Sequence, residues 1–481
     1  MWPFLIISLA AFLFYVFETW KPKEYPPGPR WLPIVGNYTF FRRRLEKLRY
    51  HHLVWDELAK MYGPVVGLKM GKDFVVTVFG MEAVREVLTR DEFDGRPDGF
   101  FFRLRTFGKR LGIVFSDGEL WQKQRKFSLH HLKNFGLGKR EMELNVAEES
   151  KELIADFDEK SGQSDFHAQR IRCERDERSL DDDGRLLDIS GGLLNQMPLV
   201  RFIAPNACGY TKVVSVLSRL WHFLEETIAE HRKTVCSSHS RDLIDAFLQK
   251  MNISTADDSF TDEQLLSLCL DLFMAGSETT SNTLSFAMLY MVKYADVQRR
   301  VQKEIDNVVG RNRWPTMQDK MNLPYTEAVL MEVMRIANVP PLGIAHRAIC
   351  EATLFGYKVP KGSIVLTSLY SIHMDKNFWK DPDQFRPERF LTEERQLIIP
   401  DWNFLPFGRG KRRCLGESLA KTNYFHFFTA MLHNFVLERD PDVDDVNTEG
   451  LTVLLYHLNL FRLSLWLEGL SVFLSDVARR V

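Results

Sequence analysis

The chain has 481 residues, 45% hydrophobic and 26% charged, and this length and composition predict a large globular core. A formal net charge of -1 excludes a strongly basic protein, so we expect no nucleic-acid partner. The six cysteines are widely scattered, without C-x-x-C pairs or zinc spacing, which argues against a disulfide framework and favours a reducing compartment.

The N-terminal segment is apolar from Met1 to Phe17 except for Ser8, which is about the minimum length for crossing a bilayer. Positive charge follows at Lys21 and Lys23, so the positive-inside rule predicts an uncleaved membrane anchor over 1–20 with the body of the protein in the cytosol. A buried core helix is the alternative. Residues 21–36 contain Pro26-Pro27-Gly28-Pro29 and predict a stiff hinge, which leaves 37–481 as the main domain.

Beyond the hinge, the periodicity predicts a mainly α fold with a small β portion. Thr261-Asp262-Glu263-Gln264 is a capping box, which predicts that a long apolar helix begins there and continues to about Tyr294. The other expected helices cover 45–62, 81–88, 296–309, 326–336 and 415–435. The expected strands cover 65–68 and 74–78, paired across Gly71-Lys72, and then 352–359 and 363–368.

The segment Phe407 to Gly416 presents Cys414 on a loop that contains Gly408 and Gly410, with basic residues before the cysteine and a helical pattern after it. Cationic neighbours, loop N–H groups and a helix N-terminus all favour the thiolate, which is the form that binds a metal. Glycine lets such a loop approach a flat ligand closely. An ordinary buried cysteine is the alternative.

This segment matches F-x-x-G-x-x-x-C-x-G and resembles the haem-thiolate monooxygenases, the cytochrome P-450 family. The resemblance implies that haem b (iron protoporphyrin IX) lies between a long central helix and the cysteine loop. Cys414 would be the metal ligand, and Phe407, Arg412 and Gly416 would bind the cofactor. The proline-rich hinge resembles that of microsomal members, which implies an endoplasmic reticulum membrane protein with a cytosolic catalytic domain over 37–481.

Within the long helix, Ala275-Gly276-Ser277-Glu278-Thr279 matches the family pattern A-G-x-[DE]-T. A mid-helix glycine costs about 1 kcal/mol relative to alanine, so we expect that the space is needed. The resemblance implies that Ala275 lies over the haem, that the helix loosens to admit dioxygen, and that Glu278 and Thr279 form the catalytic proton relay. The alternative is a close helix crossing at Ala275-Gly276, with Thr279 bonded to its own backbone.

Two further sets of residues follow from the resemblance. Glu332 and Arg335, three positions apart on a helix, would form a buried structural network with Arg389 of Pro387-Glu388-Arg389-Phe390. A solvated surface pair is the alternative. The haem propionates need cationic or hydrogen-bonding partners, and the family correspondence supplies Arg96, Trp121, Arg125, His346 and Arg412.

The substrate pocket implied by the resemblance is apolar, with Phe101, Phe115, Phe273, Val339 and Leu342 as its lining. The segments from Gly95 through Gly118 and from Phe135 to Lys139 look like arthropod microsomal members that include juvenile-hormone-pathway epoxidases. The resemblance leaves fatty acids, terpenoids and foreign compounds as alternative classes of substrate. The expected reaction is the insertion of one oxygen atom from dioxygen into a lipophilic small molecule, as a hydroxylation or an epoxidation.

No nucleotide-binding fingerprint opens a βαβ unit, so NADPH would act indirectly, through NADPH-cytochrome reductase, with a cytochrome b-type donor as a second source of electrons. The basic residues that could meet a reductase are Lys126, Lys133, Lys139, Arg140, Lys411 and Arg413. A haem-thiolate isomerase or dehydratase, and a non-catalytic variant with an incomplete fold, are the alternative functions.

Two segments depart from the family pattern, 161–188 and 455–481. The run from Arg170 to Arg178 is highly charged where the family has an apolar helix, and it predicts a solvated loop or disorder. In the second segment an apolar-amphipathic tail stands where a terminal hairpin is expected. A splice variant or an imperfect gene model would explain both departures.

Overall fold

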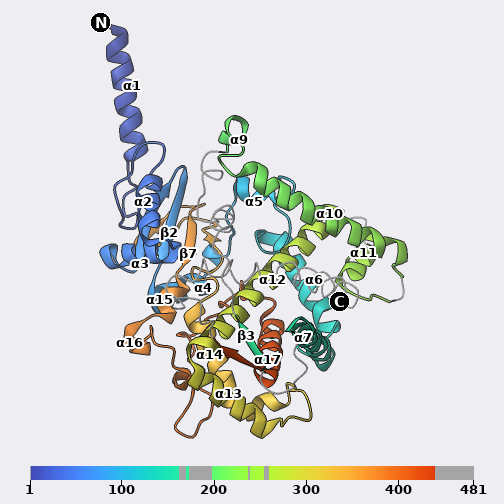
Figure 1. Ribbon diagram of the computed structural model, residues 1–481. Helices are drawn as coiled ribbons and strands as arrows, with labels where there is room; N and C mark the ends of the chain where they lie inside the picture. Colours follow the sequence, from blue (N-terminus) through green and yellow to red (C-terminus); the bar gives the residue numbers. More distant parts are fainter. Residues whose placement is uncertain (1, 162–168, 173–197, 237–238, 254–258, 439–481) are drawn as a thin grey trace.

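The computed structural model describes residues 2–161, 169–172, 198–236, 239–253 and 259–438. Helices make up most of the body, and a small sheet lies at the side from which α1 (Trp2–Thr19) projects (Figure 1). This arrangement confirms the predicted mainly α class with a small β portion. Among the described residues, no helix combines the length and the apolarity that crossing a bilayer requires.

The N-terminal half of the sheet forms as the sequence predicts, but the helix before it is divided. β1 (Val65–Met70) and β2 (Asp73–Val78) pair antiparallel around Gly71, which has a φ of 59°. Instead of one helix over 45–62 there are two, α2 (Tyr38–Leu48) and α3 (His51–Tyr62). Arg49 ends α2 because it adopts a left-handed φ of 67°. The predicted helix over 81–88 is confirmed as α4 (Gly80–Thr89).

Two distant strands complete this sheet. β7 (Ile364–Thr367) pairs parallel with β2, and β4 (His346–Arg347) pairs antiparallel with β7, which gives the order β1-β2-β7-β4. The strand predicted over 352–359 is a hairpin of β5 (Ala352–Leu354) and β6 (Tyr357–Val359). The chain turns there because Phe355 and Gly356 both have positive φ.

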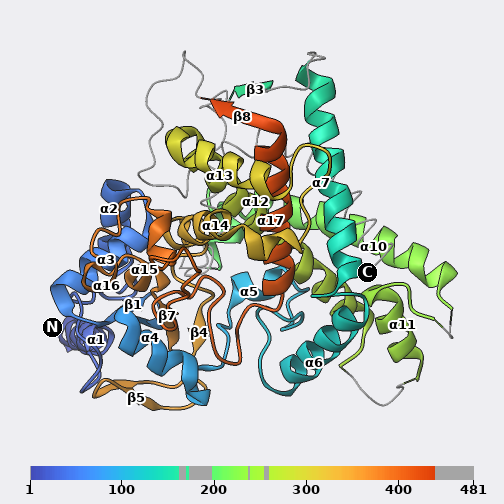
Figure 2. The same cartoon turned by 90° about the horizontal axis from the view of Figure 1, so that it is seen from below.

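A second small sheet corrects the prediction for the charged segment. β3 (Gln169–Arg172) pairs parallel with β8 (Phe435–Glu438), so the loop predicted from Arg170 is wrong for residues 170–172 (Figure 2). Extended backbone can satisfy its N–H and C=O groups through a partner strand even where the side chains are charged. The remainder of that prediction, and the one for 455–481, fall outside the described residues.

The helical body is built around α12 (Asp262–Lys293), which packs against α14 (Pro324–Ala337) and α17 (Glu417–Asn434). Thr261 caps α12 as predicted, since its side chain accepts a hydrogen bond from the Gln264 N–H at 3.2 Å. With α13 (Ala295–Val308), these helices enclose a core that includes Phe286, Val301 and Phe425. The predicted helices 296–309, 326–336 and 415–435 are thereby confirmed to within a few residues.

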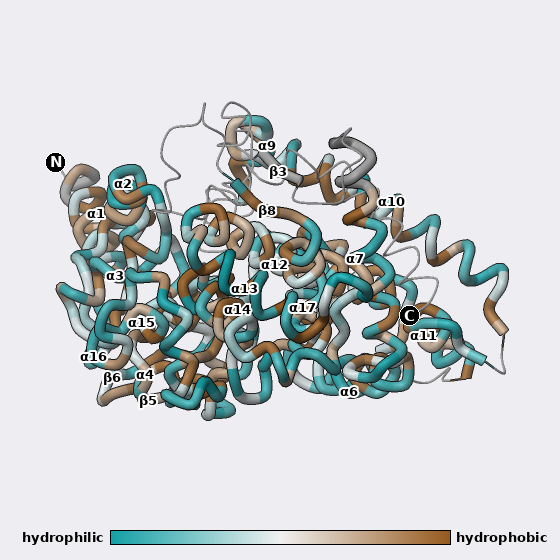
Figure 3. Tube along the Cα trace, turned by 60° about the horizontal axis from the view of Figure 1, so that its bottom comes forward, coloured by the Kyte–Doolittle hydropathy of each residue, from teal (hydrophilic) through white to brown (hydrophobic). Residues whose placement is uncertain are grey.

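The remaining helices flank this core. A second apolar cluster joins α12 to α6 (Gly118–Asn134), α10 (Tyr210–Thr234) and α11 (Leu243–Ile253). Hydrophilic residues predominate along α6 (Figure 3). The other helices and 3₁₀ turns are α5 (Phe100–Leu104), α7 (Arg140–Ser161), α9 (Val200–Ile203), α15 (Leu369–His373), α16 (Lys376–Trp379), η1 (Asp91–Phe93), η2 (Asp319–Asn322) and η3 (Pro387–Phe390).

Candidate active site

The loop before α17 holds Cys414 in a closed turn. The Cys414 N–H donates to the Phe407 carbonyl oxygen at 3.0 Å, and the Phe407 ring stacks on Tyr424 of α17. Gly410 has a φ of 78°, and a Cβ at that position would clash with the Leu88 carbonyl. The glycine is therefore required both by its backbone angle and by the close approach of α4.

The surroundings of Cys414 suit a thiolate ligand. Burial raises the pKa of the thiol, while a hydrogen bond from the Gly416 N–H and the charges of Arg125 and Arg413 act in the opposite direction. Yet Cys414 retains accessible surface. A metal ion there would displace the thiol proton, and the same N–H and guanidinium groups would stabilise the resulting anion.

Open space lies beside the middle of α12. Ala275 and Gly276 are exposed although α12 is largely buried over residues 264–271 and 280–291. A Cβ added to Gly276 would meet no atom within 4 Å, so the alternative of a close helix crossing at this position is wrong. The small residues therefore leave a space that another group can fill.

Thr279 and Glu278 lie in the next part of α12. The Thr279 hydroxyl donates to the Ala275 carbonyl oxygen at 2.7 Å, which is the self-bonded arrangement considered as the alternative for this residue, and Ser277 makes the same kind of bond to Phe273. The helix is uninterrupted, so the loosening that the family resemblance implies is not present. Glu278 keeps accessible surface, but partial desolvation raises its pKa, which makes its carboxyl a better proton donor near neutral pH.

Two arginines contact the Trp121 ring of α6, and a third lies near them. Arg412 lies 3.7 Å and Arg125 lies 5.7 Å from the centre of the Trp121 ring. Arg96 is near enough that its pKa is lowered to about 9, first by burial and then by repulsion from Arg412. The described guanidinium hydrogen bonds of these arginines all end on main-chain carbonyls: Val114, Ile344 and Ala345 for Arg96, Arg413 for Arg125, and Asp94 and Ser116 for Arg412.

His346 borders this arginine cluster as a neutral group. Its Nδ1 donates to the Phe93 carbonyl oxygen at 2.8 Å, and its pKa is lowered to about 3, first by burial and then by the charges of Arg96 and Arg412. Buried cations that lack carboxylate partners are costly unless an anion joins them. The cluster therefore fits a ligand with more than one negative charge, as the two propionates of a haem would be.

The predicted Glu332 network is present and buried. Glu332 accepts from Arg335 Nε and Nη2, each at 2.7 Å, and from Arg389 Nε at 3.2 Å. Arg335 also donates to the main-chain carbonyls of His373 and Pro382. The network thus ties α14 to the segment that leads toward the cysteine loop, and the alternative of a solvated surface pair is wrong.

The predicted pocket residues are only partly brought together. Phe273 of α12 contacts the Phe223 ring of α10, and Phe115 contacts the Phe102 ring. Val339 packs against the core that contains α14, and Leu342 packs against a different cluster, near Ala345. The side chain of Phe101 falls outside the described part of the chain. Among the described residues, no contact joins all these side chains.

Asp117 is a site residue that the sequence analysis missed. Its Oδ2 accepts from the Arg96 N–H and from the Arg110 and Arg347 side chains. Burial raises its pKa, but these donors prevail and hold the pKa at about 2. Asp117 thereby fixes the backbone beside the arginine cluster. The one signal in the sequence is an Asp-Gly pair directly before a helix, which is typical of a capping position.

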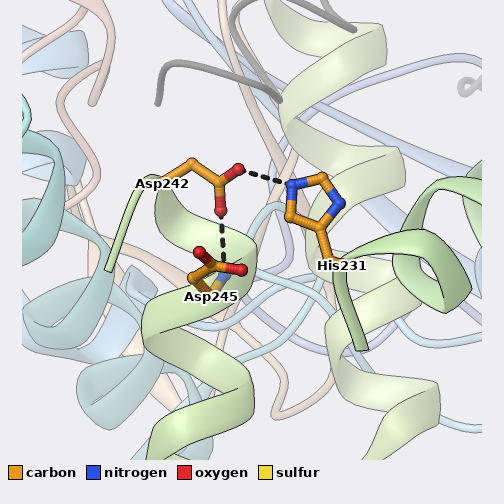
Figure 4. Close-up of side chains that lie close together, drawn as sticks. All are labelled: His231, Asp242 and Asp245. Carbon is orange, nitrogen blue, oxygen red and sulfur yellow. Dashed lines mark hydrogen bonds and ion pairs between the residues drawn. The ribbon is translucent and has the colours of Figure 1, made fainter. Parts of the chain in front are cut away.

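A second cluster of titratable residues lies between α10 and α11 (Figure 4). His231 Nδ1 donates to the Thr227 carbonyl at 2.9 Å, and its Nε2 contacts Asp242 Oδ2 at 2.5 Å. Asp242 Oδ1 accepts from the Asp245 N–H at 2.8 Å, and Asp245 also pairs with Arg241. One ligand atom from each of the two acids and the imidazole lies within 4.8 Å of the others. Each of the three residues already has a polar partner, so the cluster acts as a clamp between two helices.

Comparisons with known proteins agree with this geometry. The family model described as Cytochrome P450 matches residues 26–175 and 175–464, so the match includes all of the atypical segment 161–188 and residues 455–464 of the second one. Farnesoate epoxidase of Bombyx mori is 38% identical over 485 residues, covering 95% of this chain and 97% of that protein. Cytochrome P450 2J1 of Oryctolagus cuniculus is 36% identical, covering 91% of each chain, and cytochrome P450 2J2 of Homo sapiens is 35% identical, covering 93% of each.

The extent of the family match leads to one assignment, and both arthropod and mammalian relatives agree with it. An accessible cysteine on a glycine-containing loop is consistent with the same family. The chain belongs to the cytochrome P450 family of haem monooxygenases.

Proposed function

We propose that this enzyme inserts one oxygen atom from dioxygen into a lipophilic small molecule, with electrons that NADPH supplies through NADPH-cytochrome reductase. The observation that carries the proposal is the pairing of an accessible Cys414 thiol with a buried Arg96 and two partly buried arginines, Arg125 and Arg412. The described guanidinium hydrogen bonds of all three end on main-chain carbonyls and not on carboxylates. A metal ligand and an anion-binding cluster in one site fit haem b, and they fit a simple anion much less well.

Each residue has a distinct part in this proposal. Cys414 would hold the haem iron, and Arg96, Arg125, Arg412, Trp121 and His346 would hold the propionates. When bound, the haem supplies oxygen activation, which a thiolate ligand promotes by donating electron density. Phe407 and Gly416 position the loop and the thiolate, while Ala275 and Gly276 leave room beside α12.

The proton relay is assigned to Glu278 and Thr279. The raised pKa of Glu278 lets its carboxyl hold a proton and release it into the open space beside Gly276. The Thr279 hydroxyl donates to Ala275, so its oxygen remains able to accept a hydrogen bond from a water molecule there. The alcohol would then orient the water that Glu278 protonates.

The substrate class is an apolar molecule, with Phe101, Phe115, Phe273, Val339 and Leu342 as the proposed lining. Four of these side chains are described, and all four are partly buried and uncharged, which supports an apolar pocket. Farnesoate is the first candidate to test because a relative that matches nearly the whole chain is a farnesoate epoxidase. Epoxidation of an isoprenoid double bond would then be the reaction.

The reductase would meet the face formed by α6 and the cysteine loop. Lys126, Lys133, Lys139 and Arg140 are exposed there, and Arg125 links α6 to the loop through the Arg413 carbonyl. Lys411 is paired with Asp91 and Arg413 with Glu417, so these two are weaker candidates for contact with an acidic partner. A cytochrome b-type donor could use the same face.

For localisation, we propose the endoplasmic reticulum membrane, with residues 1–20 as the anchor, 21–36 as the hinge and 37–481 as the cytosolic catalytic domain. The supporting observation is that α1 projects from the body and exposes Phe4, Ile6, Ile7, Leu9, Phe12, Leu13, Phe14 and Phe17 (Figure 1). Such apolar exposure favours a lipid environment.

The deciding experiment is a carbon monoxide difference spectrum of the reduced protein, recorded for the wild type and for Cys414→Ser. The wild type should give a thiolate-type band, and Cys414→Ser should lose the band and all turnover. Cys350→Ser, which alters an exposed cysteine, is the matched control and should behave as the wild type. A thiolate-type band that persists in Cys414→Ser would remove this residue as the ligand.

Turnover separates the remaining functions. A monooxygenase needs NADPH and reductase to convert farnesoate or another lipophilic substrate, whereas an isomerase or dehydratase converts a preformed peroxide without either. A non-catalytic variant with an incomplete fold would give no thiolate-type band at all.

A further inference from the structure

His373 makes two hydrogen bonds that join separate parts of the active-site scaffold. It ends α15 and has no exposed surface. Its Nδ1 lies 2.9 Å from Asn338 Oδ1, just after α14, and its Nε2 lies 2.9 Å from the main-chain nitrogen of Leu405, shortly before the cysteine loop. The imidazole therefore bridges α14 and the loop.

The partners of His373 determine its protonation state. A backbone N–H can only donate, so Nε2 must carry a lone pair to accept the bond from Leu405. The ring proton is then on Nδ1, where it is donated to Asn338 Oδ1. Burial, and after it the nearby Arg335 charge, lower the pKa of His373 to about 3, which agrees with a neutral ring. A single tautomer satisfies both contacts.

Leu405 is connected to Cys414 by hydrogen bonds within the cysteine loop. The Leu405 carbonyl accepts from the Gly408 N–H at 3.0 Å, which closes the first turn of the loop. The Phe407 carbonyl within that turn accepts from the Cys414 N–H at 3.0 Å. A short series of hydrogen bonds thus connects the His373 ring to the backbone of Cys414.

The other end of the bridge is rigid. Arg335, which is held by Glu332, donates to the His373 carbonyl at 2.8 Å, so the main chain of His373 is fixed by the same buried network. Asn338 adopts a left-handed φ of 49° directly after α14, and its N–H bonds to the Met334 carbonyl. Both attachments of His373 therefore come from a part of the core that cannot shift easily.

We propose that His373 is a positioning residue for Cys414: as the acceptor for the Leu405 N–H, it holds the turn that sets where the cysteine backbone lies relative to α14. This proposal rests on Cys414 being the haem ligand. Without the acceptor, a buried N–H would be left unpaired and the turn would be free to move, which favours loss of the thiolate bond.

The test compares His373→Phe with His373→Gln in the full haem-loaded protein. Phenylalanine fills the volume but accepts no hydrogen bond, whereas the glutamine amide oxygen can reach the Leu405 N–H. We expect the thiolate-type carbon monoxide band of His373→Phe to convert to a thiol-type band roughly fivefold or more faster than in the wild type. The conversion rate of His373→Gln should lie close to that of the wild type. Hydrogen exchange of peptides that contain Leu405 and Cys414 should accelerate in His373→Phe and not in His373→Gln.

His433→Phe is the matched control. His433 is also a buried histidine that bonds one loop oxygen, Gly310 at 2.7 Å, but it lies at the far end of α17 from Cys414. Its loss should lower the unfolding temperature without changing the rate of thiolate loss. If His373→Phe gives no folded protein, Asn338→Gly tests the same bridge, because glycine tolerates the left-handed φ and removes only the amide that orients the ring.

Three outcomes would overturn the proposal: equal rates of thiolate loss in His373→Phe and His373→Gln, an equal rate in His433→Phe, or, where Asn338→Gly replaces His373→Phe, a wild-type rate in Asn338→Gly. Failure of the proposed function looks different, because in that case the wild type itself lacks the thiolate-type band or Cys414→Ser keeps it.

Discussion

Arg335 donates two hydrogen bonds to Glu332, and neither side chain has any exposed surface. Because both charges are removed from water, the pair is stable only as a unit. Replacement of Arg335 leaves the buried Glu332 charge only partly compensated, because the second arginine, Arg389, contacts only one of the two carboxylate oxygens.

We therefore expect Arg335→Ala to destabilise the fold by about 3–5 kcal/mol and to lower haem content and soluble yield. The matched control is Arg300→Ala, which removes an arginine from the exposed pair with Glu388. It should have little effect, since surface pairs contribute at most about 1 kcal/mol. Normal haem content in Arg335→Ala, measured by absorbance and protein assay, would contradict the prediction.

Thr279→Ala should leave haem binding and the carbon monoxide spectrum intact but reduce product formed per NADPH consumed, because a methyl group cannot orient water beside Gly276. Positioned proton transfer is typically worth about 10²–10⁴-fold, which sets the scale of the loss. Product, NADPH and hydrogen peroxide should be measured together. Ser277→Ala removes the same kind of helix self-bond two residues away and should remain coupled. Unchanged coupling in Thr279→Ala would leave this threonine with a helix-packing role only.

Acid sensitivity should come partly from two buried neutral histidines. The pKa values of His346 and His373 both fall from 6.5 to about 3 on folding. Because each takes up a proton on unfolding, their contribution to stability is fully present above pH 6.5 and is lost as the pH falls toward 3. From pH 7 to pH 5, wild type should lose about 2 kcal/mol more unfolding free energy than His373→Gln.

This difference can be measured by urea unfolding followed by fluorescence at the two pH values. The exposed His239→Gln should keep the wild-type pH dependence. Equal losses in wild type and His373→Gln would show that the imidazole is not held neutral in the folded protein.

The helix clamp gives another prediction. His231→Gln should lower the unfolding temperature, because Asp242 is almost fully buried and loses its ion-pair partner. His222→Gln is a close control: His222 is on the same helix and pairs with Glu226, but both side chains are largely exposed. If the two variants unfold at the same temperature, the buried pair does not stabilise the junction of α10 and α11.

Features with a fixed local spacing could be predicted from the sequence. The cysteine loop, the Thr261 cap and the Glu332–Arg335 pair each depend on residues a few positions apart, and the structure has all three. The division of the helix at Arg49 was not predictable, because the break depends on one non-glycine residue in a left-handed conformation. Local periodicity does not detect such a residue.

Contacts over long sequence separations could not be predicted either. Asp117 joins Arg96 to Arg347, and His373 joins Asn338 to Leu405, through single hydrogen bonds that have no sequence pattern. β3 was missed because its charged side chains gave no strand periodicity, and its partner β8 is more than two hundred positions away along the chain.

The parallel pairing of β2 with β7 has a consequence for biosynthesis. Residues 75–78 of β2 can pair only after residues 364–367 of β7 have been synthesised. The N-terminal hairpin therefore leaves the ribosome long before its partner strand exists. Until then, the β2 edge presents unpaired N–H and C=O groups that can associate with other chains. A nascent chain that ends before residue 364 can complete neither the sheet nor the cofactor site. Premature termination would therefore leave an aggregation-prone intermediate in place of a smaller working enzyme.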